Sequence, residues 1–303
     1  MELAPIIVFG YNRPEHYRKT LEALSKNRLA EESILYLYCD GAKEGASADA
    51  LEKIAAVRTI AHEQHWAKET HVIESETNKG LADSIISGVT DVVNRYGSVI
   101  VLEDDLITSP GFLFYMNNAL DLYKSDDRVM HVTGYMYPHK WHLPETFFFE
   151  VPHCWGWGTW SRAWQYFTND TEFLYNYWKG DWGSFDKFGG KVLSEQLIFN
   201  FKGTLNTWFI KWYSVVLMMN GLALYPGKSL IMNNGFNEGA TNCHETHLFD
   251  VNPVAYIDVY RIPIKSNKRA AKIIYDVYQG HWYNKRRRQE FFRKIMKIFR
   301  LCR

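Results

Sequence analysis

Residues 98–106, with the sequence SVIVLEDDL, constrain the fold more than any other stretch of this chain. Residues 99–102 form an uninterrupted apolar run, which is typical of a β-strand buried on both faces. The run ends in three consecutive carboxylates, Glu103, Asp104 and Asp105. Because neighbouring carboxylates repel one another unless a cation neutralises them, the pattern predicts a Mg²⁺ or Mn²⁺ site that carries substrate phosphates. An acidic loop that caps the following helix would explain the same residues without a ligand.

Strand-like and helical patterns alternate along the first third of the chain. Apolar runs at 4–11, 33–39 and 71–75 are each followed by a polar turn and then by a helical pattern. Such alternation predicts an α/β fold with a mostly parallel sheet and helices on both faces. Because the carboxyl ends of parallel strands meet at one edge of a sheet, the turns after four strands should converge there. The turn residues expected at this edge are Asn12, Arg13, Asp40, Asn78, Lys79, Gly80, Glu103, Asp104 and Asp105.

Each of these turn residues also has a local explanation. Asn12 and Asp40 could cap helices, and Gly80 could serve a tight turn. Four strand ends with polar groups favour a shared ligand site over a set of separate turns. No Gly-x-Gly-x-x-Gly follows the first strand and no Gly-Lys-Ser/Thr loop occurs, which argues against dinucleotide-binding and P-loop proteins.

The middle of the chain is rich in aromatic residues. After a strand-like run at 128–133, residues 154–162 read CWGWGTWSR. Glycines between tryptophans allow close backbone approach, so this segment suits the wall of a sugar or acceptor pocket, although the rings could equally fill a loop-rich subdomain. The pocket residues expected here are Trp155, Trp157, Gly158 and Trp160. Further on, the pattern predicts one buried helix over 194–219 and short strands at 222–226 and 229–233.

The predicted convergence of strand ends resembles the GT-A fold of nucleotide-sugar-dependent glycosyltransferases. Residues 101–112, VLEDDLITSPGF, are similar to the Glu-Asp-Asp segment of the mannosyl-glycoprotein N-acetylglucosaminyltransferase family. Many bacterial surface-polysaccharide transferases combine such a string with a segment like GWGTW at 156–160. The resemblance covers about residues 4–162, and residues 195–245 more loosely.

The resemblance implies roles for the donor side. Asp105 would bind Mn²⁺ or Mg²⁺ beside the diphosphate, while Glu103 and Asp104 would lie near the ribose and sugar, with Asp104 also a catalytic candidate. Arg13 would lie near a uridine diphosphate and Asp40 near the uracil or ribose, so a UDP-sugar is the favoured donor. The nucleotide-sugar-binding residues implied in this way are Asn12, Arg13, Asp40, Asn78, Lys79, Gly80, Glu103 and Asp104.

The acceptor side departs from the family pattern. In the eukaryotic relatives an Asp lies on a helix of the second half, but residues 206–212 here contain no acid. Glu195 is the first alternative for a catalytic base, followed by Asp181 and Asp186, so inversion at the sugar carbon remains open. His244 is a tentative additional metal ligand, although a surface histidine is the commoner case.

The expected activity is therefore that of a hexosyl- or N-acetylhexosaminyltransferase acting on a glycan or lipid-linked glycan, in bacterial surface-polysaccharide synthesis. Two alternatives remain. A nucleotidyltransferase acting on sugar phosphates would normally carry a Gly- and Lys-rich loop after its first strand. A catalytically inactive glycan-binding protein would explain the missing base.

Positive charge is concentrated at the end of the chain. Residues 285–303 hold nine Lys/Arg and one Glu, a net charge of +8, so the total of +1 leaves −7 on residues 1–284. Residues 284–303 therefore predict a basic amphipathic helix that binds an anionic membrane surface, where each Lys or Arg contributes about 1 kcal/mol. The acidic remainder argues against nucleic acid as a partner.

The sequence also predicts compartment and domains. No signal peptide is evident, no apolar run approaches the roughly 20 residues of a membrane span, and the four cysteines form no CxxC pair, which fits a reducing compartment. We expect a cytoplasmic protein, peripheral at the inner face of the cytoplasmic membrane. The expected domains are a glycosyltransferase domain at 1–250, with a nucleotide-sugar half at about 1–133 and an acceptor half at about 134–250, and an extension at 251–303.

Overall fold

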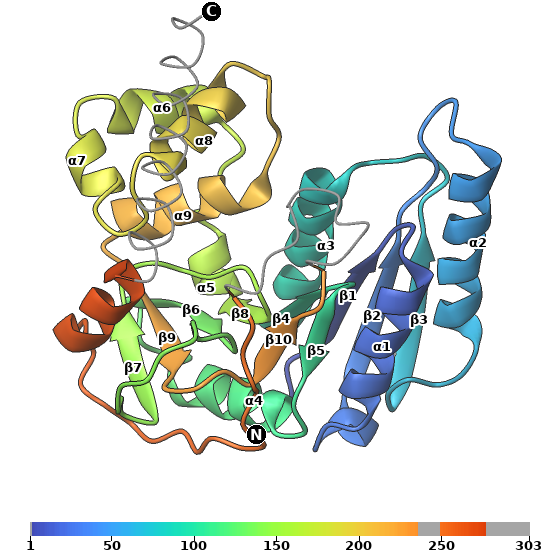
Figure 1. Cartoon of the computed structure of the whole chain (residues 1–303), viewed down its shortest axis with the longest axis horizontal. Coiled ribbons are helices and arrows are strands. Elements are labelled where there is room, and N and C mark those ends of the chain that lie inside the picture. Colours follow the sequence, from blue (N-terminus) through green and yellow to red (C-terminus); the bar gives the residue numbers. More distant parts are fainter. Residues whose placement is uncertain (1, 236–248, 277–303) are drawn as a thin grey trace, which may run out of the picture.

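A central mixed sheet organises the molecule. The computed structural model describes residues 2–235 and 249–276, and its main sheet has eight strands in the order β3-β2-β1-β4-β8-β6-β9-β7 (Figure 1). These strands are β1 (Ile6–Gly10), β2 (Ile34–Cys39), β3 (Glu69–Glu74), β4 (Ser98–Glu103), β6 (Val129–Thr133), β7 (Thr146–Phe149), β8 (Trp157–Trp160) and β9 (Leu222–Pro226). The short strands β5 (Leu106–Thr108) and β10 (Ile231–Asn233) form a separate antiparallel pair.

The N-terminal half confirms the predicted strand–helix alternation. Strands β1 to β4 pair in parallel, and the connecting helices are α1 (Pro14–Ser25), α2 (Ala48–His62) and α3 (Leu81–Tyr96). Strand β1 is buried along its whole length, and all four apolar residues of β4 are buried as well. Such strands can exist only between two covering layers, which is why their sequences show continuous apolar runs instead of alternation.

Strand β8 interrupts the parallel order. It lies antiparallel between β4 and β6, so that Gly158 pairs with both Ile100 and Val132. A Cβ atom at position 158 would lie only 2.9 Å from the carbonyl oxygen of Val99 and 3.0 Å from Cε of Met116. Glycine is therefore required here by the closeness of β4 and of helix α4 (Phe112–Leu122).

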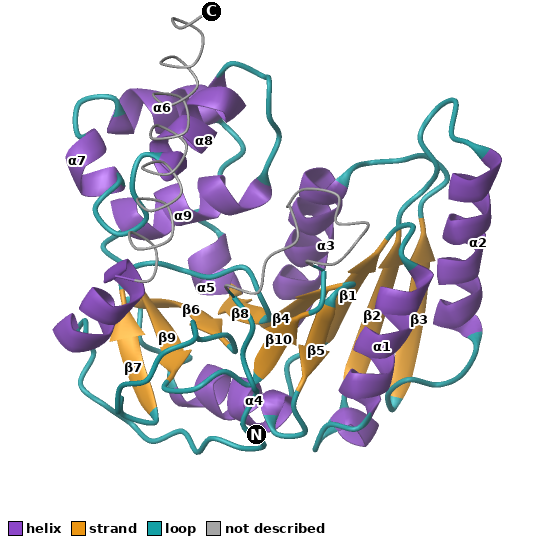
Figure 2. Ribbon diagram, viewed as in Figure 1, coloured by secondary structure: helices purple, strands orange, loops and turns teal. Residues whose placement is uncertain are grey.

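The helices α6 (Thr171–Trp178), α7 (Trp182–Phe185), α8 (Val192–Phe201) and α9 (Trp208–Met218) gather at one end of the molecule, as Figure 2 shows. The short helix α5 (Ser161–Trp164) directly follows β8 and lies next to it and to α3. The prediction of one helix over 194–219 was wrong, because α8 ends before Gly203, whose φ is +69°. Asn200 stabilises the connection between α8 and α9. Its Oδ1 accepts from the Thr207 N–H at 2.9 Å, and its Nδ2 donates to the Thr207 hydroxyl at 3.0 Å.

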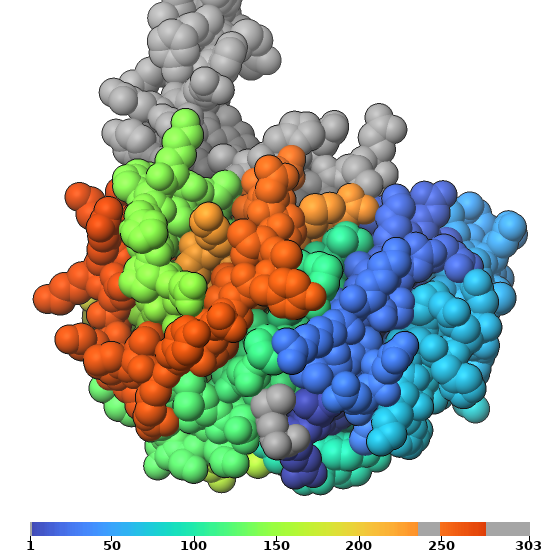
Figure 3. Space-filling model, turned by 90° about the horizontal axis from the view of Figure 1, so that it is seen from below, coloured from blue at the N-terminus to red at the C-terminus, as the bar shows by residue number. Residues whose placement is uncertain are grey.

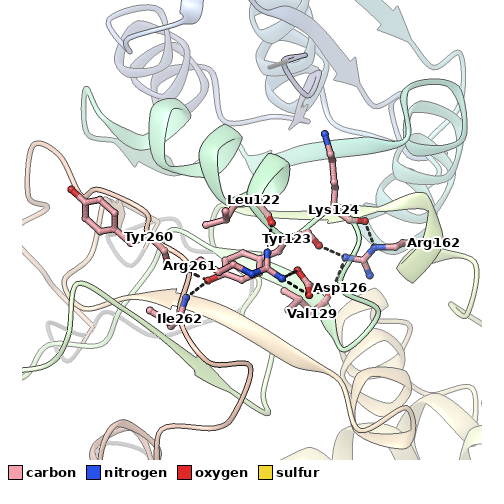
Figure 4. A network of polar contacts seen from close by, with 9 residues as sticks. All are labelled: Leu122, Tyr123, Lys124, Asp126, Val129, Arg162, Tyr260, Arg261 and Ile262. Atoms are coloured by element: carbon pink, nitrogen blue, oxygen red, sulfur yellow. Dashed lines mark hydrogen bonds and ion pairs between the residues drawn. The ribbon is translucent and has the colours of Figure 1, made fainter.

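Residues 249–267, which we call the C-terminal strap, run back over the surface of the sheet domain (Figure 3). The Gly111 N–H donates to the Ala255 carbonyl at 2.9 Å, and Ser266 forms a parallel bridge with Phe148. Arg261 donates to both oxygens of Asp126 at 2.8 Å (Figure 4). The strap therefore packs on earlier parts of the chain, and residues 268–276 follow as a helix.

Two parts of the sequence hypothesis fall outside the described residues. His244 lies in the range 236–248 and the basic segment 284–303 lies in the range 277–303, and the structure describes neither range. Within residues 2–235 and 249–276, no helix combines the length and the apolar character that crossing a membrane requires.

Candidate functional site

Asp40 organises the carboxyl ends of β2 and β3. Its Oδ1 accepts from the backbone N–H groups of Gly41 and Lys79, both at 2.9 Å. Its Oδ2 accepts from Nδ2 of Asn78 and the N–H of Gly80, both at 3.0 Å. Gly80 has φ +76°, a left-handed conformation in which glycine carries no steric penalty, at the N-terminus of α3. The structure thus brings Asp40, Asn78, Lys79 and Gly80 together, as predicted, but it uses the Asp40 carboxylate to fold the loop. Contact of these residues with a nucleotide stays a prediction.

Arg13 contacts two members of the acidic triplet. It lies with Asn12 in the turn between β1 and α1, and its Nη1 is 3.0 Å from Oδ2 of Asp105 and 3.4 Å from Oδ1 of Asp104. The three side chains are 13–18% exposed, so water screens these ion pairs only in part. The other terminal nitrogen of Arg13, Nη2, is buried and has no hydrogen-bond partner within residues 2–235 and 249–276.

The β5–β10 pair brings a distant segment to the triplet. Leu106 pairs with Asn233, and the next residue, Asn234, donates its N–H to the Asp105 carbonyl at 2.8 Å. Nδ2 of Asn233 lies 3.4 Å from Oδ1 of Asp105. A Cβ atom at Gly235 would lie 2.2 Å from Oδ2 of Asp105, so only glycine allows this approach. The sequence hypothesis missed Asn233, Asn234 and Gly235, although an Asn-Asn-Gly turn directly after an apolar run was a signal for them.

The acidic triplet is short of positive charge. Burial raises the pKa of Glu103 to about 8, and repulsion from Asp105 and Asp104 adds to the shift while Arg13 opposes it. Burial and repulsion from Asp105 raise the pKa of Asp104 to about 7, again against the effect of Arg13. No hydrogen bond or ion pair joins the Glu103 side chain to any described residue. One guanidinium therefore pairs with two of three neighbouring carboxylates, and a bound divalent cation would relieve the remaining repulsion.

A divalent cation fits this oxygen-rich edge in one specific way. The described residues contain no cluster of three or more His, Cys, Asp or Glu side chains arranged to hold a metal ion. Mg²⁺ and similar ions instead often bind through one or two carboxylates and complete their coordination with water and substrate phosphates. The residues present fit this second type of site, with Asp105, whose side chain is 15% exposed, as one such carboxylate.

The tryptophan segment lies mostly in the core, which corrects the expectation of a pocket wall. Trp157 is fully buried and stacks between His131 and Trp208, at centroid distances of 5.4 and 4.9 Å. Trp160 is 3% exposed, and Gly158 lies inside the sheet. The reason is that this segment forms the inner strand β8, where both faces are covered. Trp155, outside the strand, is partly exposed and packs against Tyr135, so its role in a pocket stays a prediction.

The candidate bases lie in the helical group. Glu195 is exposed on α8, and its catalytic role stays a prediction. Asp181 caps α7 by accepting from the Ser184 N–H, and Asp186 accepts from both the N–H and the hydroxyl of Ser194. These two carboxylates therefore have structural functions.

A buried lysine occupies the acid-free segment 206–212. Lys211 is 3% exposed and donates to the side-chain oxygens of Asn169 at 2.6 Å and Asn206 at 2.8 Å. Burial lowers the pKa of Lys211, and the negative charge of Asp83 opposes the shift. Asp83, in the first turn of α3, accepts from Asn206 at 3.3 Å. A carboxylate, Asp83 of α3, therefore lies next to this acid-free segment. Its distance along the sequence gave no indication of this contact.

No protein-family model matches this chain, and no curated protein matches it. Among solved structures, the chain is similar to TarS of S. aureus, with 14% identity and a TM-score of 0.32 over 48% of this chain and 23% of TarS. The chain therefore spans about a quarter of TarS. It is similar to a UDP-glucose pyrophosphorylase complexed with UDP-glucose, with 10% identity and a TM-score of 0.37 over 74% of this chain and 90% of the other. Mouse xyloside xylosyltransferase 1 in its apo form is similar over 72% of this chain and 82% of its own, with 11% identity and a TM-score of 0.38. Likenesses at this level concern the α/β arrangement alone and carry no argument about substrate or chemistry.

Proposed function

We propose that this protein is a metal-dependent glycosyltransferase that moves a hexosyl or N-acetylhexosaminyl group from a nucleotide sugar, with UDP-sugars favoured, to a glycan or lipid-linked glycan in bacterial surface-polysaccharide synthesis. One observation carries the proposal: at the end of β4, where three carboxylates follow one another, Arg13 forms ion pairs with two of them, and the loop held by Asp40 lies at the ends of β2 and β3 in the same sheet. This edge needs a cation, and a metal-bound diphosphate supplies one together with further ligands.

The residues of the edge divide the work as follows. Asp105 would hold the Mn²⁺ or Mg²⁺ ion, which when bound stabilises the negative charge that develops on the leaving diphosphate. Arg13 would pair with a phosphate oxygen, and the exposed Lys79 is available for the same purpose. Asp40 keeps the Asn78–Gly80 loop in position at the N-terminus of α3, where a helix favours anions. Removal of the acceptor proton requires a base, for which Glu195 remains the first candidate.

Release of nucleoside diphosphate from a panel of nucleotide sugars, measured with Mn²⁺ present, tests this function. We expect Asp105→Asn to lower the rate about tenfold to a hundredfold, because the metal loses its charged ligand. Asp258→Asn, at an exposed position of the strap, is the matched control. Equal rates for wild type and Asp105→Asn would contradict the metal assignment. Binding of a nucleotide sugar without release would favour an inactive glycan-binding protein, and pyrophosphate exchange would favour a nucleotidyltransferase.

We also propose, from the sequence of residues 284–303, that the protein is cytoplasmic and binds the inner face of the membrane through its basic tail. Truncation before Asn284 should reduce sedimentation with vesicles that contain anionic phospholipid, because nine cationic side chains are removed. Vesicles of neutral lipid alone serve as the control. Equal sedimentation of the full-length and truncated proteins with anionic vesicles would rule out this role of the tail.

A further inference from the structure

Arg13 contacts the carboxylate of Asp105, which is the proposed ligand of the metal ion. Its Nη1 donates to Oδ2 of Asp105 at 3.0 Å, while Oδ1 of the same carboxylate faces Nδ2 of Asn233 at 3.4 Å. Both oxygens of the proposed metal ligand are therefore engaged by the protein itself. A cation of the Mg²⁺ type binds carboxylate oxygen at about 2.1 Å, closer than the guanidinium. Two cations on one oxygen repel each other, so the metal and Arg13 exclude one another at this position.

The surroundings hold the guanidinium in place. Gly235 packs so closely that a Cβ atom there would lie 2.8 Å from Nη2 of Arg13. Asp104 adds a second negative partner at 3.4 Å. However, the buried Nη2 has no hydrogen-bond acceptor among the residues of the described ranges. A buried donor without an acceptor costs free energy. An anion that accepts hydrogen bonds from both terminal nitrogens would remove this cost and would therefore attract the Arg13 side chain.

We infer that Arg13 is a resident counter-ion that competes with the divalent cation for Asp105, and that a nucleoside diphosphate relieves the competition by drawing the guanidinium onto its phosphates. This inference rests on the proposed function and adds a regulation of the same site. Metal and nucleotide then bind with positive coupling, which is reciprocal because it is a free energy shared by the two binding equilibria. Until the nucleoside diphosphate binds, Arg13 remains the counter-ion of Asp104 and Asp105.

Titration of Mn²⁺ into the protein, followed by the electron paramagnetic resonance signal of free Mn²⁺, tests the inference without any activity measurement. Without nucleotide, Arg13→Gln should bind Mn²⁺ about tenfold more tightly than wild type, a difference of about 1.4 kcal/mol. With saturating UDP, the affinities of the two proteins should converge. The coupling factor, which is the ratio of the Mn²⁺ dissociation constants without and with UDP, should thus be about tenfold larger in wild type.

Arg18→Gln is the matched control, because Arg18 lies on α1, the helix that begins directly after Arg13, and forms an exposed ion pair with Glu63. Its Mn²⁺ affinity should equal that of wild type. If Arg13→Gln does not fold, as judged by circular dichroism, Arg13→Lys replaces it. Lysine keeps the charge but not the planar fork, so about threefold tighter Mn²⁺ binding is expected.

The outcomes separate the inference from the proposed function. One outcome would overturn only the role of Arg13 and leave the proposed function intact. In it, wild type binds Mn²⁺ when UDP is present, but wild type and the Arg13 variant bind Mn²⁺ with equal affinity when UDP is absent. Failure of wild type to bind Mn²⁺ even with UDP would overturn the proposed donor site as well. Loss of binding in Asp105→Asn in both conditions would support the site on which the inference depends.

Discussion

As the pH falls from about 4.5 to about 3.5, two buried histidines alone should lower the free energy of unfolding by about 2.8 kcal/mol per pH unit, since each contributes about 1.4 kcal/mol. Burial lowers the pKa of His131 to about 3, against a hydrogen bond to the His153 carbonyl. Burial also lowers the pKa of His153 to about 3, and His131 adds to the shift. In the unfolded chain both rings bind a proton below about pH 6.5, so the unfolded state gains protons first and acid favours unfolding.

The hydrogen bonds of His131 explain why the folded protein keeps the ring neutral. Nδ1 accepts from Nε1 of Trp212 at 3.2 Å, and Nε2, 3.0 Å from the His153 carbonyl oxygen, then carries the proton. A second proton on the ring would place an N–H at Nδ1 opposite the Trp212 N–H. Because both faces of the ring are packed, with Trp157 stacked on one of them, no water can replace the lost acceptor.

His131→Asn measures this contribution directly. Urea unfolding at several pH values should give a slope of stability against pH that is lower than in wild type by about one proton, or about 1.4 kcal/mol per pH unit. The exposed His65→Asn is the control and should keep the wild-type slope. Unchanged acid dependence in His131→Asn would show that His131 is not held neutral. The slope is the readout, because the smaller side chain lowers stability at every pH.

The carboxylates decide the pH range of this experiment. The raised pKa values of Glu103, about 8, and Asp104, about 7, mean that the folded protein holds protons that the unfolded chain loses from about pH 4 upward. These two groups therefore lower stability as pH rises, and they oppose the histidines up to about pH 6.5. Below about pH 4 their opposition fades, so the lower part of the pH range shows the effect of the histidines best.

The strand ends were predictable because their signals are local. An apolar run that stops at Asp40 or Glu103 indicates both the strand and the residue at which it ends. The parallel pairing of β1, β2 and β4 confirms that the carboxyl ends of these strands lie at one edge of the sheet. Physical rules on parallel sheets then bring the turns together without knowledge of individual contacts. Arg13 and Asp105 were expected at the same edge for this reason, although their ion pair was not.

What the sequence could not predict depends on contacts between distant parts of the chain. Asn233 contacts Asp105, which lies 128 positions earlier in the chain, because β10 pairs with β5, and three-residue strands carry almost no periodic signal. The run at Trp157–Trp160 was interpreted as a pocket wall because tryptophan and glycine suit either a wall or an inner strand. Its position between β4 and β6 decides the matter, and that position is set by pairing over long range.

Asp40→Asn should lower the free energy of unfolding by about 3 kcal/mol, because a buried carboxylate with several hydrogen-bond donors around it loses charge-assisted bonds worth about 1.5–3 kcal/mol each. Asp40 is only 9% exposed and accepts from four donors, two on each oxygen. An amide keeps one acceptor oxygen but turns its NH₂ group toward two of these donors, which leaves polar groups unpaired. The Asn78–Gly80 loop should then lose its position at the start of α3.

Urea unfolding at pH 7 measures this loss, and nucleotide binding measures its consequence. Asp258→Asn, at an exposed site, should stay within about 0.5 kcal/mol of wild type, as surface substitutions usually do. If Asp40 acted only as a ligand of the nucleotide, Asp40→Asn would bind UDP more weakly while its stability stayed at the wild-type value. If the proposed function holds, both should fall together, because the carboxylate binds the loop proposed to form this side of the nucleotide site. A variant that unfolds at the wild-type urea concentration would therefore contradict the central role of Asp40 at this edge of the sheet.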